Sequence, residues 1–418
     1  MKTVGIIAEY NPFHNGHAYH IHKSRELTGA DFVIVAMSGD FVQRGAPSIL
    51  DKYTRTQMAL CCGADLVLEL PVRYACGSAE YFATGAVSLL HNLSVVDALC
   101  FGGESNQLSF FTKISEILFN EPDFYSDRLR EHLSCGLSYP TARANALLDY
   151  CQQADKSGCF CDAQNLSAFL ASPNNILGIE YCKALHRLSS SIEPAVLQRV
   201  ESDYHQETLS EQFSSATAIR RHLAEKDLHS IKNQLPPEAF SLLKEAVRTN
   251  RLSTLEDYSL LLKYKLMCET PESLTQYQDM SAELANRVYG KLNQFESIPQ
   301  FIQELKTKEL TYTRISRALL HVLLNVQSFS LAANSQDIAP YARILGFRKD
   351  SVSLLGQIKK KSCIPLISKL ADRQKILNGD GLAMLDEDIW CANLYESVVA
   401  SHSSEGYKNE IAKGIVVV

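Results

Sequence analysis

The chain has 418 residues, of which 46% are apolar and 21% charged, and its formal net charge is −6. This length supports two or three domains, and the balance of residue types is that of a globular protein. The net acidity argues against a generally basic nucleic-acid binder, and no apolar stretch predicts a signal peptide or a membrane-spanning helix. Twelve scattered cysteines favour the reducing cytoplasm as its location.

Apolar runs and helical patterns alternate through the first hundred residues. Strands are predicted at residues 3–8, 31–37, 66–70 and 98–101, and helices at 18–27, 52–62 and 78–90. Gly29 and Gly63 follow the first two helices, where glycine commonly ends a helix. This alternation predicts a parallel sheet with right-handed crossovers, which binds its ligands at the carboxyl ends of the strands.

The loop after the first strand, residues 9–17, carries the strongest functional signal. His14, Gly16 and His17 stand where a helix begins, and free N–H groups there favour phosphate. Gly16 has no Cβ, so a phosphate can approach the backbone closely. The two histidines could stabilise the charge that develops when an α-phosphate is attacked. We interpret the loop as a nucleotide site; the alternative is a pair of solvent-facing histidines.

Two later loops carry further candidate groups. Asp40 and Arg44 follow the second strand, where the arginine could bind phosphate or a carboxylate and Asp40 a cation or an amine. A surface salt bridge is the alternative for Arg44. Gly102 follows the fourth strand and would allow an adenine or a ribose to approach the backbone.

Two predicted helix starts add polar side chains. Asn174 and Asn175 open one helix, and they could bind a nucleotide or cap the helix. Ser215, Thr217 and Arg220 open another, within the segment 214–220, and hydroxyls with free N–H groups suit phosphates there.

Residues 14–17 resemble the signature of the nucleotidyltransferase superfamily. The segments 9–17, 37–45, 173–178 and 214–220 together resemble the bacterial tRNA(Met) cytidine acetate ligase family, over essentially the whole chain. The resemblance implies that ATP activates acetate to acetyl-adenylate, with Mg²⁺ on the phosphates and without acetyl-CoA. The acetyl group then passes to N4 of the wobble cytidine of elongator tRNA(Met), which gives N4-acetylcytidine.

The resemblance also assigns site residues. His14 and His17 are expected to be catalytic. The ATP site is expected to comprise Ile7, Ala8, Glu9, Tyr10, Asn11, Pro12, Phe13, His14, Asn15, Gly16, His17, Ala18, Tyr19, His20, Gly102, one of Asn174 and Asn175, and Arg199. Of the two asparagines, Asn174 is slightly favoured by its spacing to Arg199.

The C-terminal half carries an uneven charge. Residues 306–375 contain 13 Lys or Arg and 4 Asp or Glu, an excess of nine positive charges. Such asymmetry indicates a region that meets a polyanion, although a solvated helical surface explains it equally well. Aromatic residues among these charges suit exposed bases and phosphates. The candidate tRNA contacts are Arg314, Arg317, Arg343, Arg348, Lys349, Lys359, Lys360 and Lys361.

The expected architecture is an α/β fold. A Rossmann-like, parallel-sheet nucleotidyltransferase domain is predicted at residues 1–222, a helical connecting region at 223–303 and an α-rich, basic tRNA-binding region at 304–418. Two other functions use the same features. A small-molecule adenylyltransferase of the pantetheine-phosphate or nicotinate-mononucleotide type would not need the basic C-terminal half, and a non-catalytic RNA-binding protein would not need intact histidines.

Overall fold

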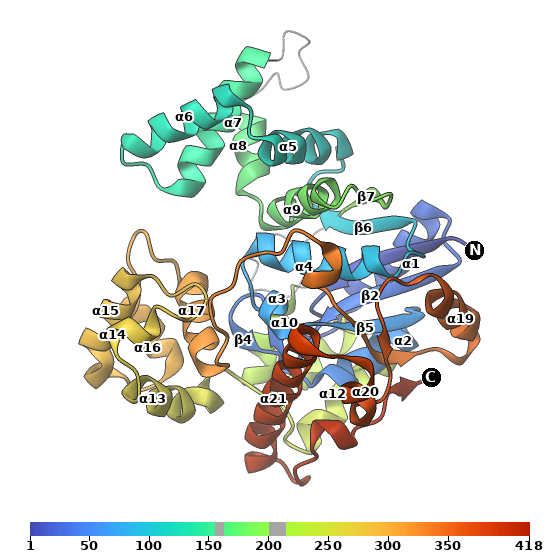
Figure 1. The fold of residues 1–418 in the computed structure, drawn as a ribbon. Helices are drawn as coiled ribbons and strands as arrows, with labels where there is room; N and C mark the ends of the chain where they lie inside the picture. The colour runs from blue at the N-terminus through green and yellow to red at the C-terminus, as the bar shows by residue number, and fades with distance from the viewer. Residues whose placement is uncertain (155–162, 200–214) are drawn as a thin grey trace.

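A computed structural model describes residues 1–154, 163–199 and 215–418 (Figure 1). Its centre is an eight-stranded sheet of order β10-β8-β5-β2-β1-β6-β7, with β9 paired to β8. The strands are β1 Thr3–Ala8, β2 Phe32–Ser38, β5 Leu66–Leu70, β6 Ala98–Gly103, β7 Glu193–Gln198, β8 Ala342–Phe347, β9 Leu366–Ile367 and β10 Val416–Val417. The pairs from β5 to β7 are parallel, which confirms the predicted core of the sheet.

Helices cover both faces of the sheet, because its central strands are apolar on both sides. One face carries α1 Asn15–Thr28, α2 Lys52–Cys61, α10 Ala216–Ala224, α11 Leu228–Ile231 and α12 Pro237–Arg248. The other face carries α3 Val72–Ala75, α4 Ala79–Asn92, α9 Pro173–Arg187, α18 Ser335–Ile338 and α19 Val352–Lys361. The result is the doubly wound α/β arrangement expected from the alternating elements.

Two helical groups extend from this centre (Figure 1). The first, α5 Leu108–Asn120, α6 Asp123–Ser134, α7 Tyr139–Ala154 and α8 Ala163–Ala171, attaches through α5, which packs on α9. The second has its own apolar core and comprises α13 Ser259–Met267, α14 Pro271–Leu274, α15 Ala282–Lys291, α16 Ile298–Leu305 and α17 Tyr312–Leu323. We call this second group the helical bundle. The long α21, Gly379–His402, packs against both the bundle and the sheet domain, and the short α20, Arg373–Ile376, precedes it.

The region expected to be α-rich contributes three strands to the central sheet, which corrects that expectation. Strand β8 pairs antiparallel with β5, while β9 and β10 pair with β8. The predicted boundary between residues 303 and 304 therefore separates strands of one sheet. Within the described residues, no helix combines the length and the apolar character needed to cross a membrane.

Candidate active site

The loop between β1 and α1 is folded by a reciprocal cap between its two histidines. The N–H of Gly16 donates to Nδ1 of His14 at 3.1 Å, and the N–H of His14 donates to Nδ1 of His17 at 3.3 Å. Histidine thus fills the role that Ser or Thr and Glu usually share at a helix start. The two imidazole rings stack with their centroids 3.8 Å apart.

These caps determine which ring nitrogen carries the proton. Since Nδ1 of His14 and of His17 accepts a backbone N–H, the proton of each neutral ring lies on Nε2. Burial, with the positive charge of Arg199 nearby, lowers the pKa of His14 to about 3 and that of His17 well below its usual value. Both rings are therefore neutral at pH 7 and present Nε2–H donors to the cavity that they line.

Two arginines from other helices donate hydrogen bonds to backbone carbonyl oxygens of this loop. Arg55 of α2 is fully buried and donates to the carbonyl oxygens of Glu9 at 2.6 Å and Ser38 at 3.0 Å. It thereby joins the carboxyl ends of β1 and β2. Arg220 of α10 donates to the carbonyl oxygen of Asn11 at 2.6 Å. The histidine loop is fixed by contacts from elements distant in the sequence, so its shape is set before a ligand arrives.

A cavity of about 600 Å³ opens at this edge of the sheet. Its wall combines the loops after β1, β2, β6 and β7 with α9, α10, residues 252–255 and the first turns of α17. Of the predicted ATP and phosphate contacts, the structure brings together Ile7, Ala8, Glu9, Tyr10, Asn11, His14, His17, His20, Arg44, Gly102, Asn174, Arg199, Ser215, Thr217 and Arg220. Ser214, at the start of the predicted motif, lies outside the described residues.

The other residues between Pro12 and Tyr19 that were predicted to contact ATP do not form part of this wall. Pro12, Phe13, Asn15, Gly16, Ala18 and Tyr19 do not line the cavity, and Phe13 is fully buried in the core. The two asparagines also differ. Asn175 is buried and its Oδ1 accepts the N–H of Glu104 at 3.0 Å, so it holds the loop after β6. Asn174 lines the cavity, with its amide donating to the Glu104 carboxylate at 2.7 Å.

Asp40 does not reach the cavity, which corrects its assignment as a possible substrate contact. It is 6% exposed, accepts the N–H of Lys52 at 2.8 Å and lies 3.7 Å from the Lys52 ammonium. Burial raises the pKa of Asp40 to about 6, although Lys52 opposes the rise. Its carboxyl group shapes the loop after β2 from within the protein.

Comparisons with known proteins identify the family to which this chain belongs. A profile of the HIGH nucleotidyl transferase family matches residues 1–410. A tRNA(Met) cytidine acetate ligase of Halothermothrix orenii is 39% identical over 393 residues, which cover 93% of this chain and 92% of that protein. One of Acetivibrio thermocellus is 38% identical over 423 residues and covers 100% of both chains. The chain belongs to the tRNA(Met) cytidine acetate ligase family.

The similarity to this ligase family includes the three-dimensional fold. The crystal structure of Thermotoga maritima TmcAL bound with alpha-thio ATP superposes with a TM-score of 0.91 at 31% identity, over 100% of this chain and 99% of that one. The apo form of the same protein gives a TM-score of 0.92. The similarity includes the helical bundle and the C-terminal strands, so the small-molecule adenylyltransferase alternative is not favoured.

In this ligase chain, two of the residues predicted to contact tRNA, Arg343 and Arg317, have structural partners instead. Arg343 is 2% exposed within β8 and forms ion pairs with Glu69 and Glu410. Its expected surface role is wrong, because the strand that carries it lies inside the sheet. Arg317 is half-buried and pairs with Asp279 at 3.1 Å.

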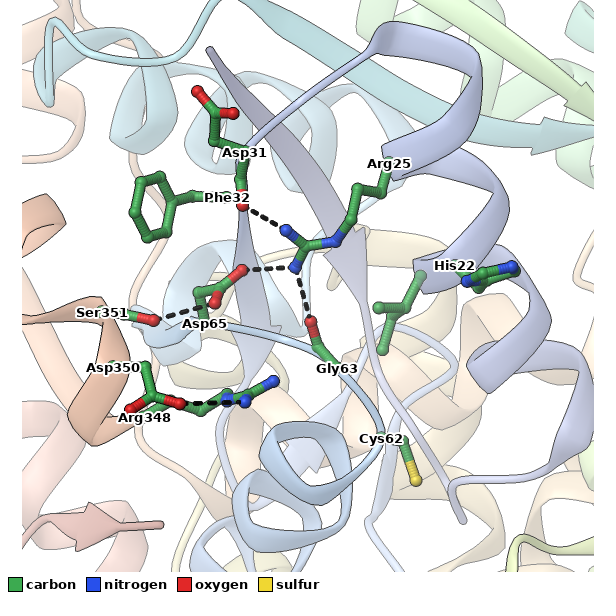
Figure 2. A pocket seen from close by; sticks show the side chains of 11 residues that line it. His22, Arg25, Asp31, Phe32, Cys62, Gly63, Asp65, Arg348, Asp350 and Ser351 are labelled. Carbon is green, nitrogen blue, oxygen red and sulfur yellow. Dashed lines mark hydrogen bonds and ion pairs between the residues drawn. The ribbon is translucent and has the colours of Figure 1, made fainter. Parts of the chain in front are cut away.

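Arg348 and Lys349 lie at the opposite edge of the sheet from the cavity, because β8 runs antiparallel to β5. Figure 2 shows a second, smaller cavity at that edge, where Arg25 donates to Asp65 at 2.6 Å and Arg348 pairs with Asp350 at 3.4 Å. Since its charged groups satisfy one another, this cavity is part of the scaffold. Arg314, Lys359, Lys360 and Lys361 remain exposed, with α17 and α19 on opposite sides of the molecule (Figure 1).

Sequence reasoning missed several wall residues. Phe101, Tyr181, residues 252–255, Tyr312, Thr313 and Ser316 line the cavity, and Arg55 supports it from behind. The only sequence signal at Tyr312 and Thr313 was their place beside Arg314, at the start of a basic helix.

Proposed function

We propose that this chain activates acetate with ATP to acetyl-adenylate and transfers the acetyl group to N4 of the wobble cytidine of elongator tRNA(Met). The observation that carries the proposal is the pair of Nε2–H donors of His14 and His17, held in an open cavity of a tRNA(Met) cytidine acetate ligase family member. Free acetate is the acyl donor, and acetyl-CoA has no role.

In the first step, an acetate oxygen attacks the α-phosphorus of ATP and pyrophosphate leaves. The negative charge that builds on the α-phosphate oxygens is met by the Nε2–H groups of His14 and His17 and by the N-terminus of α1. Arg44 and Arg220, which both line the cavity, supply positive charge for the carboxylate and the phosphates.

The nucleotide is placed on the β6 and β7 side of the histidine loop, where Gly102, Asn174 and Arg199 line the cavity. The hydroxyls of Ser215 and Thr217, at the start of α10, suit the β and γ phosphates. Among the described residues that line the cavity, Glu9 is the only carboxylate. Mg²⁺ therefore enters as part of the substrate, bound to the ATP phosphates.

The proposal predicts acetyl-AMP and pyrophosphate when the protein is mixed with ATP and labelled acetate in the absence of tRNA. Addition of total bacterial tRNA should transfer the label to N4-acetylcytidine in elongator tRNA(Met), which nucleoside analysis detects. Acetylation that required acetyl-CoA and ignored free acetate would overturn the proposed chemistry.

The tRNA face is proposed to lie beside the cavity mouth, where Arg314 follows the wall residues Tyr312 and Thr313. We predict that Arg314→Glu weakens tRNA binding more than Lys360→Glu, because α19 lies on the far side of the molecule (Figure 1). Loss of one phosphate contact should also lower the slope of log affinity against log salt by about one. Filter binding measures both effects, and Lys244→Glu, at an exposed residue of α12, is the control of equal charge change.

Acetyl-AMP formation without tRNA should continue in all three variants. A larger effect of Lys360→Glu would move the RNA face to α19. Unaltered affinity in both variants, with a normal melting curve, would return the small-molecule adenylyltransferase to consideration.

A further inference from the structure

The cavity extends well beyond the proposed nucleotide site. The histidine loop follows β1, which lies between β6 and β2 in the sheet. Gly102 lies at the carboxyl end of β6 and Arg199 follows β7 on one side of it, whereas residues 42–47 follow β2 on the other. We call the part lined by Val42, Gln43, Arg44, Ala46, Pro47, Ile49, residues 252–255, Tyr312, Thr313 and Ser316 the β2-side chamber. A nucleotide bound on the β6 side does not fill this chamber. A second molecule in the chamber would therefore approach the α-phosphate from the β2 side.

The wall of the β2-side chamber suits a flat, uncharged ring. Val42 and Ile49 are buried apolar residues, and Pro47 and Leu255 add further apolar surface. Tyr312, the first residue of α17, is half-buried and lines the chamber. The chamber is lined by two loops and a helix, and it is much larger than acetate. Apolar and aromatic walls of this kind take up nucleobases that have been turned out of a single-stranded RNA loop.

The position of Tyr312 is fixed by close packing between α17 and the loop after β2. The Ser316 hydroxyl donates to the carbonyl oxygen of Gly45 at 2.7 Å. Gly45 has a φ of 78°, and a Cβ at this residue would lie 2.4 Å from the backbone nitrogen of Arg317. Only glycine permits that approach, so the chamber wall is rigid across the junction between sheet domain and bundle.

The first turn of α17 has two chemically different sides. Tyr312 lines the chamber, whereas Arg314, two residues later, is exposed. An aromatic ring toward the cavity and a guanidinium outside it match a nucleotide whose base enters while its phosphates remain at the surface.

We propose that the β2-side chamber is a pyrimidine pocket that receives the cytosine of the tRNA, with Tyr312 as its stacking wall. This inference rests on the proposed function and adds to it the place from which the acceptor approaches. No residue of the chamber belongs to the predicted ATP or tRNA contacts except Arg44.

The placement accounts for the transfer step. Cytosine N4 attacks the carbonyl carbon of acetyl-AMP, and a C–N bond forms. The bond from that carbon to the phosphate oxygen breaks, and AMP leaves with its electron pair. N4 loses one proton, which passes to Glu9, the only carboxylate among the described lining residues. The Glu9 carboxylate is held toward this side by the N–H of Gln43, which donates to it at 2.9 Å.

The test separates the two half-reactions. Acetyl-AMP formation is measured by acetate-dependent exchange of pyrophosphate into ATP without tRNA, and transfer by a single turnover from enzyme-bound acetyl-AMP to tRNA. Stacking on one base contributes about 1–3 kcal/mol, so transfer by Tyr312→Ala should fall about five- to 150-fold more than adenylation does. Tyr312→Phe keeps the ring and should transfer at nearly the parental rate.

A direct readout uses an anticodon stem-loop with the fluorescent base pyrrolocytosine at the wobble position. Its fluorescence should change when the parent binds, and Tyr312→Ala should lose that change. Tyr264→Ala is the matched control, because Tyr264 is a 70% exposed tyrosine of α13 in the same bundle, outside the cavity wall.

Other outcomes would contradict either the pyrimidine pocket or the proposed function. Transfer by Tyr312→Ala at the parental rate, or an equal loss of adenylation and transfer, would overturn the pocket. An equal loss in Tyr312→Phe and Tyr312→Ala would replace stacking with a hydroxyl contact and overturn the wall assignment. A parent that forms no acetyl-AMP from acetate would instead contradict the proposed function, whatever the Tyr312 variants do.

Discussion

Replacement of His14 or His17 by alanine should lower acetyl-AMP formation by about two to three orders of magnitude, as the loss of an oxyanion donor does in other enzymes. The reason is the Nε2–H group that each neutral ring offers to the cavity. Because burial holds the pKa of His14 at about 3, this donor persists unchanged from pH 5 to 8. ATP binding should weaken much less, because the charge in question develops only in the transition state.

Alanine at residue 14 also removes a helix cap, which alone costs about 1 kcal/mol of stability. His14→Asn and His17→Asn separate the two roles. An asparagine oxygen lies where Nδ1 lies, so it still accepts the backbone N–H, but nothing replaces Nε2–H. Both asparagine variants should melt like the parent and lose the rate like the alanine variants. Near-normal exchange of pyrophosphate in an asparagine variant would show that its histidine serves only as a cap.

The sheet core was predictable because its signals are local. Strands β1, β2, β5 and β6 are short apolar runs, and the glycines at 29 and 63 follow the helices that return the chain to the sheet. The histidine loop was predictable for the same reason, since a strand, a tight turn and a helix start adjoin in sequence. Their arrangement at one sheet edge then follows from the parallel topology alone.

Strand β8 was missed because its evidence lies elsewhere in the chain. Its sequence, ARILGF, places a charged residue in a strand, and charge in an apolar run reads as surface. Arg343 is acceptable there only because Glu69 of β5 and Glu410 near the C-terminus neutralise it. Asp40 was misassigned for the same reason, since its partner Lys52 belongs to α2.

Arg55 and Tyr312 illustrate a second limit. In the sequence, Arg55 is a single arginine in an ordinary helix. In the structure it donates hydrogen bonds to backbone carbonyl oxygens, and every residue has a carbonyl, so the sequence does not indicate its partners. Tyr312 lines the cavity only because the bundle packs on the loop after β2. Single-sequence reasoning finds motifs that adjoin, whereas walls built by long-range packing require the fold.

Breaking the buried ion network around Arg343 should destabilise the protein strongly. Lys52 lies 2.7 Å from Glu69 and 2.7 Å from Glu410, and Arg343 contacts both carboxylates from the other side. Although burial opposes it, Lys52 and Arg343 lower the pKa of Glu410 well below its usual value. All four side chains are at most 4% exposed. The network joins α2, β5, β8 and the C-terminal segment.

Arg343→Met should therefore reduce the free energy of unfolding by about 3–5 kcal/mol, because it removes the cation that contacts both buried carboxylates and leaves Glu69 with Lys52 alone and Glu410 with Lys52 and the more distant Lys413. Urea denaturation measures the loss, and Glu410→Gln added to Arg343→Met should recover part of it by removing the excess negative charge. Arg348→Met is the matched control: its side chain is 37% exposed and pairs with Asp350 at 3.4 Å, so we expect a change within about 0.5 kcal/mol. A stable Arg343→Met protein with weakened tRNA binding would restore the surface role predicted for Arg343. A destabilised protein whose folded fraction binds tRNA normally would establish that this arginine acts inside the sheet.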